Sequence, residues 1–131
     1  MRNILIVGAG KSSPYLIKYL IEKSFEEDLF LNIYDLNIEN LKIYSKNERC
    51  HVSLINITDE NQREEIIIKN DIIISMLPAR FHFMLAKSCL KFKKNLLTAS
   101  YVDDDMKSLN KEVISKNLIF LNEIGLDPGI D

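Results

Sequence analysis

Cysteine and histidine are scarce in this sequence of 131 residues, which has two of each. Cys50 and Cys89 lie too far apart for a Cys-x-x-Cys redox pair, and neither His51 nor His82 has partners at metal-ligand spacing. These absences argue against a disulfide framework and against a metal site. They predict two reduced, largely buried thiols.

The sequence also lacks an excess of charge of one sign. Seventeen lysines and arginines are matched by 19 acidic residues, so the formal net charge is −2 and the basic residues form no cluster that would suggest nucleic acid. No apolar run reaches the ~18 residues of a membrane span. The apolar start MRNILIVGAG has no signal-peptide cleavage pattern. We therefore expect a cytoplasmic globular protein without nucleic-acid or membrane partners.

Apolar runs alternate regularly with amphipathic segments along the whole chain. The run NILIV is continuous and apolar, which is typical of a strand buried on both faces. In PYLIKYLIEKS, Leu16, Ile17, Leu20 and Ile21 recur at helical spacing. The same reasoning predicts strands at 3–7, 29–35, 51–57, 71–77, 95–100 and 118–123, and helices at 14–24, 37–46, 59–70, 79–91 and 103–117.

Single helices between successive strands predict parallel pairing through crossover connections. Six such strands indicate one α/β domain, a doubly wound parallel six-stranded sheet (the Rossmann fold) with strand order 3-2-1-4-5-6. We find no linker or internal domain boundary in residues 1–131. Ligands of this architecture bind beyond the carboxyl ends of the strands, so candidate site residues are sought there.

The first predicted strand ends in the glycine loop GAGKSS. Gly8 allows a tight turn and Gly10 lets the backbone approach a pyrophosphate, while Ser13 replaces the third glycine of G-x-G-x-x-G. A Walker phosphate loop is excluded because Leu5 stands where its first glycine should be. An ordinary strand-to-helix turn is the alternative. The dinucleotide contacts expected here are Gly8, Gly10, Lys11, Ser12 and Ser13.

Asp35 ends the second predicted strand, where a carboxylate can accept hydrogen bonds from the adenosine ribose. Leu36 follows it, and no lysine or arginine appears before Lys42. A 2′-phosphate would therefore meet a negative charge without a neighbouring cation. This pattern predicts NAD as the cofactor rather than NADP.

The later strand ends carry further polar groups. SMLP, residues 75–78, could line the cofactor or simply end a strand at Pro78. TASY places the hydroxyls of Ser100 and Tyr101 at the mouth of the same crevice, although a buried tyrosine would also fit. The sixth strand runs into NEIGLDPGID, a stretch crowded with turn formers and carboxylates that include Asp127.

Together these motifs resemble the N-terminal dinucleotide-binding domain of saccharopine dehydrogenase, the L-glutamate-forming kind. The matching stretches are GAGKSS, SMLPARFH, TASY and NEIGLDPGID, in register over essentially the whole chain. The family oxidises the secondary amine of saccharopine by hydride transfer to NAD(P). Hydrolysis of the imine then gives L-glutamate and 2-aminoadipate 6-semialdehyde, a step of lysine metabolism. The resemblance thus implies an oxidoreductase acting on a CH–NH donor.

The resemblance also implies a role for each candidate residue, with no catalytic acid or base assigned. NADP-using members tend to carry arginine where Leu36 stands, which agrees with NAD. Asp35 and Leu36 would contact the adenosine ribose, and Asn56 and Ile57 would contact the adenine. The far half of the cofactor would be contacted by Ser75, Met76, Leu77 and Pro78. Saccharopine or the nicotinamide would be contacted by Ser100, Tyr101 and Asp127.

The family continues beyond NEIGLDPGID with a larger domain that binds most of the substrate. The resemblance therefore predicts that residues 1–131 form an N-terminal fragment and that any homodimer contact belongs to the further domain. Two alternatives remain open. An NAD-sensing regulatory module would explain the glycine loop and Asp35, but not TASY and LDPGID. A related dehydrogenase, such as one acting on carboxynorspermidine, fits less well with NEIGLDPGID.

Overall fold

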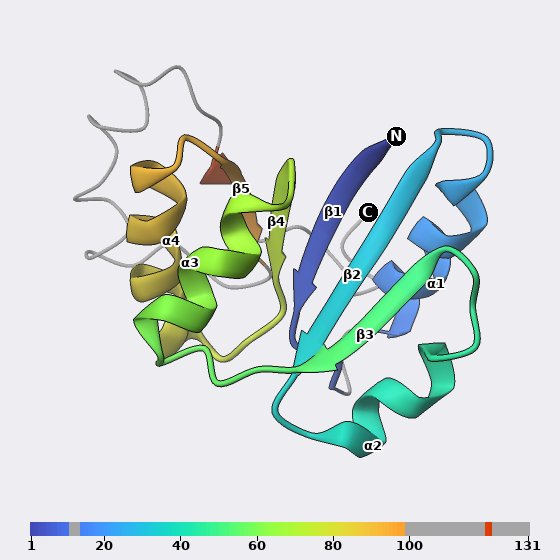
Figure 1. The fold of residues 1–131 in the computed structure, drawn as a ribbon, viewed down its shortest axis with the longest axis horizontal. Coiled ribbons are helices and arrows are strands. Elements are labelled where there is room, and N and C mark those ends of the chain that lie inside the picture. The colour runs from blue at the N-terminus through green and yellow to red at the C-terminus, as the bar shows by residue number, and fades with distance from the viewer. Residues whose placement is uncertain (11–13, 99–119, 122–131) are drawn as a thin grey trace, which may run out of the picture.

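A six-stranded parallel sheet forms the centre of the computed structural model, which describes residues 1–10, 14–98 and 120–121 (Figure 1). The strand order is β3-β2-β1-β4-β5-β6, which confirms the predicted order. The strands are β1 (Arg2–Val7), β2 (Leu29–Asp35), β3 (Cys50–Leu54), β4 (Ile72–Ser75), β5 (Asn95–Thr98) and β6 (Phe120–Leu121). The helices are α1 (Pro14–Ser24), α2 (Ile38–Leu41), α3 (Glu60–Ile68) and α4 (His82–Lys91), with 3₁₀ turns η1 (Lys42–Tyr44) and η2 (Ala79–Phe81).

Helices cover both faces of the sheet, as the doubly wound prediction requires. Figure 1 shows α1 and α2 on one side and α3 and α4 on the other. Because side chains of a strand alternate between faces, β1 contributes to both layers. Leu5 and Val7 belong to the core cluster with α3 and α4, while Ile4 and Ile6 belong to the cluster with α1 and α2. All four are buried, and each such burial contributes about 1.5–3 kcal/mol.

Two helices, α2 and α3, begin where side-chain caps predict them to begin, whereas α4 begins at His82 without a side-chain cap, after η2. Asn37 Oδ1 accepts the backbone N–H of Glu39 at 2.9 Å, and Asp59 Oδ1 accepts that of Gln62 at 3.1 Å. Each bond satisfies a donor that the first helical turn leaves unpaired, and an alanine at such a cap costs roughly 1 kcal/mol. None of the helices in the described ranges is long and apolar enough to cross a membrane.

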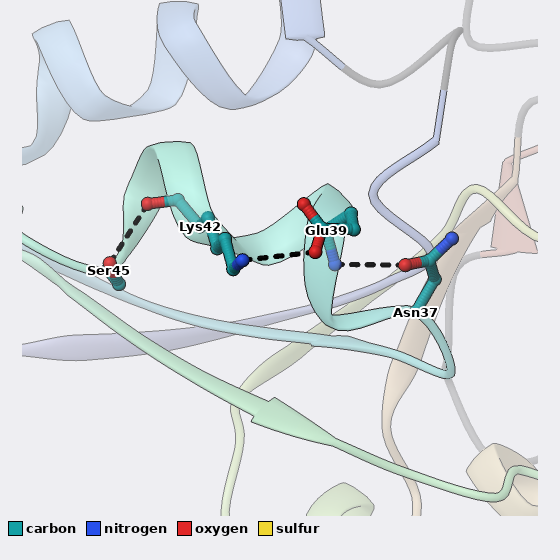
Figure 2. Close-up of polar contacts among 4 residues, drawn as sticks. All are labelled: Asn37, Glu39, Lys42 and Ser45. Atoms are coloured by element: carbon teal, nitrogen blue, oxygen red, sulfur yellow. Dashed lines mark hydrogen bonds and ion pairs between the residues drawn. The ribbon is translucent and has the colours of Figure 1, made fainter.

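The helix predicted to run to residue 46 is shorter than expected. α2 ends at Leu41, and the backbone tightens into η1, where the N–H and the hydroxyl of Ser45 both donate to the carbonyl of Lys42. Figure 2 shows this hydroxyl bond together with the cap of α2. A serine hydroxyl competes for carbonyls in this way, which ends the regular helix early.

The strand predicted at 51–57 also ends early, at Leu54. The N–H of Ile55 still donates to the carbonyl of Asp35, but the Asn56 side chain then accepts from the N–H and the hydroxyl of Thr58. This local turn removes the backbone from the sheet. Ile55 and Ile57 are buried, as the apolar pattern predicts. Only the hydrogen bonding of these residues differs from that of a strand.

The two cysteines are free, as expected, but they differ in burial. Cys89 is fully buried on α4, and burial raises the pKa of its thiol to about 12. Cys50 is only half-buried on β3, so the prediction of a largely buried thiol was wrong there; burial raises its pKa to about 11. Both thiols are therefore protonated at neutral pH. No cluster of potential metal ligands occurs within the part of the chain that the structure describes.

Candidate dinucleotide-binding site

The carboxyl ends of β1, β2 and β3 converge at one edge of the sheet, the lower edge in Figure 1. The glycine turn after β1 forms the centre of this edge. Gly8 has a φ of 98°, and its N–H donates to the carbonyl of Tyr34 at 2.7 Å. A Cβ at this position would lie 3.0 Å from the carbonyl carbon of Met76 and 3.2 Å from the nitrogen of Leu77. Only glycine can adopt this φ and also allow the backbone at position 8 to lie this close to the backbone of Met76 and Leu77.

Gly10 stands in a different environment. A Cβ added there would have no heavy atom within 4 Å, so the neighbouring protein does not demand a glycine. The space next to Gly10 is open to a ligand, which suits the close approach of a pyrophosphate to the backbone. The other predicted contacts of this loop, Lys11, Ser12 and Ser13, lie outside the described residues.

The Asp35 carboxylate joins the glycine turn to the start of α2. Its Oδ2 accepts the backbone N–H of Ala9 at 2.8 Å and the side-chain amide of Asn40 at 3.1 Å. Its Oδ1 accepts the backbone N–H of Asn37 at 3.2 Å. These bonds hold the carboxylate at the end of β2, where the ribose of a dinucleotide would bind. The next side chain, Leu36, is 68% exposed.

A narrow, largely apolar pocket of about 60 Å³ opens beside Asp35. It brings together five residues that the sequence singled out as cofactor contacts: Asp35, Leu36, Asn56, Ile57 and Leu77. Its remaining lining residues are Val7, Ile55, Thr58 and Phe81. A pocket with apolar walls and a carboxylate at its rim is chemically suited to a flat base joined to a polar sugar.

Sequence reasoning missed Phe81 as a member of the site. Its only signal was its place three residues after Pro78, within the stretch SMLPARFH. The turn η2 makes this placement possible, because the N–H of Phe81 donates to the carbonyl of Pro78 at 3.0 Å. The chain thereby folds back at the end of β4 and directs Phe81 to the pocket that also contains Leu77.

The wall of the pocket formed by residues 55–58 is braced from α3. The Gln62 side chain accepts the N–H of Asn56 at 3.1 Å. Arg63 donates from Nη1 to the carbonyl of Ile57 at 3.0 Å and from Nε to the hydroxyl of Ser88 on α4 at 2.9 Å. Arg63 therefore connects the loop, α3 and α4 through one side chain, and its planar guanidinium can make both bonds at once.

Three of the four predicted contacts at the end of β4 do not line this pocket. Ser75 is fully buried, and its hydroxyl accepts the N–H of Leu77 at 3.4 Å. Met76 is buried in the core cluster with α1, and its N–H donates to the carbonyl of Val7 at 2.8 Å. Pro78 is exposed. Any cofactor contact of Ser75 would therefore come from its backbone, because its side chain is enclosed.

Ser100, Tyr101 and Asp127, the predicted substrate contacts, lie outside the described residues and stay predictions. A larger groove of about 610 Å³ lies between α3 and α4, with Arg63, Glu64, Lys87 and Lys91 among its lining residues. It contains none of the predicted site residues. The smaller pocket lies at the carboxyl ends of the strands, where ligands of doubly wound sheets bind, and is therefore the candidate site for a dinucleotide.

Comparisons with known proteins agree with this arrangement. A family model described as saccharopine dehydrogenase NADP binding domain matches residues 4–121. The NADP(+), L-glutamate-forming saccharopine dehydrogenase of Saccharomyces cerevisiae is 28% identical over 130 residues, which are 99% of this chain and 28% of that protein. The mitochondrial alpha-aminoadipic semialdehyde synthase of Bos taurus is 33% identical over 131 residues, 99% of this chain and 14% of that protein.

A solved structure is similar over the whole chain. The apo structure of saccharopine dehydrogenase (L-Glu forming) from Saccharomyces cerevisiae aligns with a TM-score of 0.86 at 27% identity, covering 100% of this chain and 29% of that chain. The present chain therefore spans less than a third of the length of these relatives.

Proposed function

This chain belongs to the family of saccharopine dehydrogenase NADP binding domains, and on that premise we propose that it is the dinucleotide-binding part of a saccharopine-oxidising enzyme. The reaction would convert saccharopine to L-glutamate and 2-aminoadipate 6-semialdehyde in lysine metabolism. The observation that carries the proposal is the convergence of the Gly8 turn, the Asp35 carboxylate and the pocket at one sheet edge. A cytoplasmic location and a homodimer belong to the same proposal, although the relative from Bos taurus is named mitochondrial.

Different residues at this edge would bind different parts of the dinucleotide. When bound, the dinucleotide supplies the hydride acceptor of the reaction. The open space at Gly10 would admit the pyrophosphate, and Asp35 would accept a hydrogen bond from the adenosine ribose. Ile57 and Phe81, which line the pocket, would contact the adenine. Asp127, as an anion, would position the cationic amine of saccharopine, with Ser100 and Tyr101 nearby.

We further propose that this chain prefers NAD, although its yeast relative is named for NADP(+). Asp35 presents a negative charge, and the exposed Leu36 beside it offers no hydrogen-bond donor. Lys42, the nearest cation in the sequence after Asp35, is paired with Glu39 at 3.0 Å (Figure 2). Repulsion between Asp35 and a 2′-phosphate about 4 Å away would therefore weaken the binding free energy of NADP by about 1–4 kcal/mol.

The first test compares NADH and NADPH by fluorescence titration of the chain. We expect NADH to bind about fivefold to a thousandfold more tightly than NADPH, which corresponds to a repulsion of 1–4 kcal/mol. Leu36→Arg should narrow or reverse this difference, because a guanidinium beside the 2′-phosphate can form a bidentate ion pair. Leu36 is exposed, so the substitution should leave stability nearly unchanged.

Ile68→Arg is the matched control, since Ile68 is also an exposed aliphatic residue, 53% accessible, but lies on α3 outside the pocket. It should leave the ratio of the two affinities unchanged. Equal affinities, or tighter binding of NADPH, would contradict the preference for NAD. Binding of neither dinucleotide would contradict the proposed function itself.

The second test concerns turnover. Because the chain spans 28% of its yeast relative, we expect it to bind NADH without producing NADH from saccharopine and NAD. Absorbance of the reduced nicotinamide measures this directly, with the yeast relative supplied with NADP as the positive control. Saccharopine-dependent NADH formation by this chain alone would contradict the proposal that it provides only the dinucleotide-binding part of the enzyme.

A further inference from the structure

The Asp35 carboxylate accepts three donors from two segments beside the proposed ribose site, the glycine turn and the start of α2. Ala9 belongs to the glycine turn, Asn37 is the N-cap of α2, and Asn40 lies in the first turn of that helix. All three donate to the carboxylate, at distances from 2.8 to 3.2 Å. Two of these donors are backbone N–H groups, which only a proline would remove, so Asn40 provides the one of the three that an ordinary side-chain substitution removes.

The distribution of these bonds determines what remains for a ligand. An ionised carboxylate has roughly four acceptor positions, two on each oxygen. Oδ2 accepts both Ala9 and Asn40, so its positions are filled. From the residues that the structure describes, Oδ1 accepts only the N–H of Asn37, which leaves about one position on that oxygen with respect to them. The amide of Asn40 therefore distinguishes the two oxygens and leaves Oδ1 for a ribose hydroxyl.

Helix formation alone does not explain an asparagine at this position. In a capping box the third helical residue reaches back to the N–H of the N-cap, and glutamate or glutamine performs this role. Here the N–H of Asn37 donates to Asp35, and Asn40, the third residue of α2, turns its amide to the same carboxylate. Asn40 is thus directed at the proposed ribose site. Asparagine is a poor helix former, so this position favours the contact with Asp35 over the stability of the helix.

We infer that Asn40 is a positioning residue for the dinucleotide, which holds Oδ2 of Asp35 so that Oδ1 accepts a ribose hydroxyl and which thereby supports the preference for NAD over NADP. This inference rests on the proposed function. Asn40 acts through Asp35, so its substitution should change the ratio of NADH affinity to NADPH affinity. A residue that only stabilised α2 would weaken binding of both dinucleotides together.

The experiment measures the affinities of NADH and NADPH, and the thermal unfolding midpoint, for the chain and four variants. In Asn40→Ala the carboxylate loses one donor, worth about 1 kcal/mol, so NADH should bind about fivefold more weakly while NADPH changes less than twofold. Asn40→Ser has a hydroxyl too short to replace the amide and should behave in the same way, which covers the case that the alanine variant does not fold. Asn40→Gln keeps an amide donor and should restore at least half of the lost discrimination.

Asn37→Ala is the matched control. It removes the cap of the same helix, which costs roughly 1 kcal/mol, but leaves the backbone donor to Asp35 in place. It should lower the unfolding midpoint without changing the affinity ratio. The inference is overturned if Asn40→Ala and Asn40→Ser leave the ratio unchanged, or if Asn37→Ala changes it equally. Binding of neither dinucleotide by the unaltered chain would overturn the proposed function and this inference with it, whereas an affinity ratio that Asn40→Ala leaves unchanged would overturn only the inference.

Discussion

Replacing Gly8 with alanine is expected to lower the free energy of unfolding by roughly 2–6 kcal/mol. A φ of 98° costs a residue with a side chain about 1–3 kcal/mol. The new methyl group would also lie 3.0–3.2 Å from backbone atoms of Met76 and Leu77, and relieving such an overlap costs about 1–3 kcal/mol more. Because the neighbours are main-chain atoms just after β4, no side chain can rotate away to relieve the overlap. Urea unfolding followed by far-UV circular dichroism measures the loss.

Gly10→Ala is the matched control for this effect. The same methyl group meets no atom within 4 Å, so the free energy of unfolding should change by less than about 1 kcal/mol. The substitution should instead weaken NADH binding, because the methyl group occupies the space proposed for the pyrophosphate. Equal losses of stability at Gly8 and Gly10 would contradict the assignment of separate structural and ligand-binding roles to the two glycines.

Replacing Arg63 with alanine is expected to cost about 3–6 kcal/mol of stability and to weaken NADH binding. The substitution removes two hydrogen bonds from a charged donor, which contribute about 1.5–3 kcal/mol each when their partners are enclosed. The hydroxyl of Ser88, a residue only 4% exposed, would lose its donor, and the carbonyl of Ile57 would be released from α3. Since Ile57 lines the proposed adenine pocket, its wall would become less ordered.

Arg80→Ala separates this effect from a simple loss of positive charge. Arg80 lines the same groove between α3 and α4, but it is exposed, and its guanidinium lies 4.7 Å from the centre of the Phe81 ring. Such a contact contributes about 0.5–1 kcal/mol at an exposed site. Thermal unfolding and NADH titration of both variants provide the comparison. A stability loss for Arg63→Ala no greater than that for Arg80→Ala would show that the brace is unimportant.

The sequence predicted the layout of the site through features that act locally. Asn37 and Asp59 cap helices wherever the chain places them, because a cap needs only the next few backbone N–H groups. Gly8 and Asp35 were recognisable because each follows a buried apolar run, and the ends of such runs lie at the same edge of a parallel sheet. Phe81 and Arg63 lacked such a signal, since their roles depend on segments distant in the sequence.

The amino-acid sequence by itself determined the alternation of strands and helices, the strand order and the glycine at the turn, because hydrophobic period and backbone conformation are properties of short segments. The tertiary structure decided where β3 leaves the sheet and which oxygen of Asp35 remains for a ligand. It also decided which side chains enclose the pocket. These outcomes follow from hydrogen bonds and packing between segments that meet only in the folded chain. A short sequence pattern contains no information about partners that lie 20 or 30 residues away, such as Ser88 for Arg63 or Asp35 for Ala9.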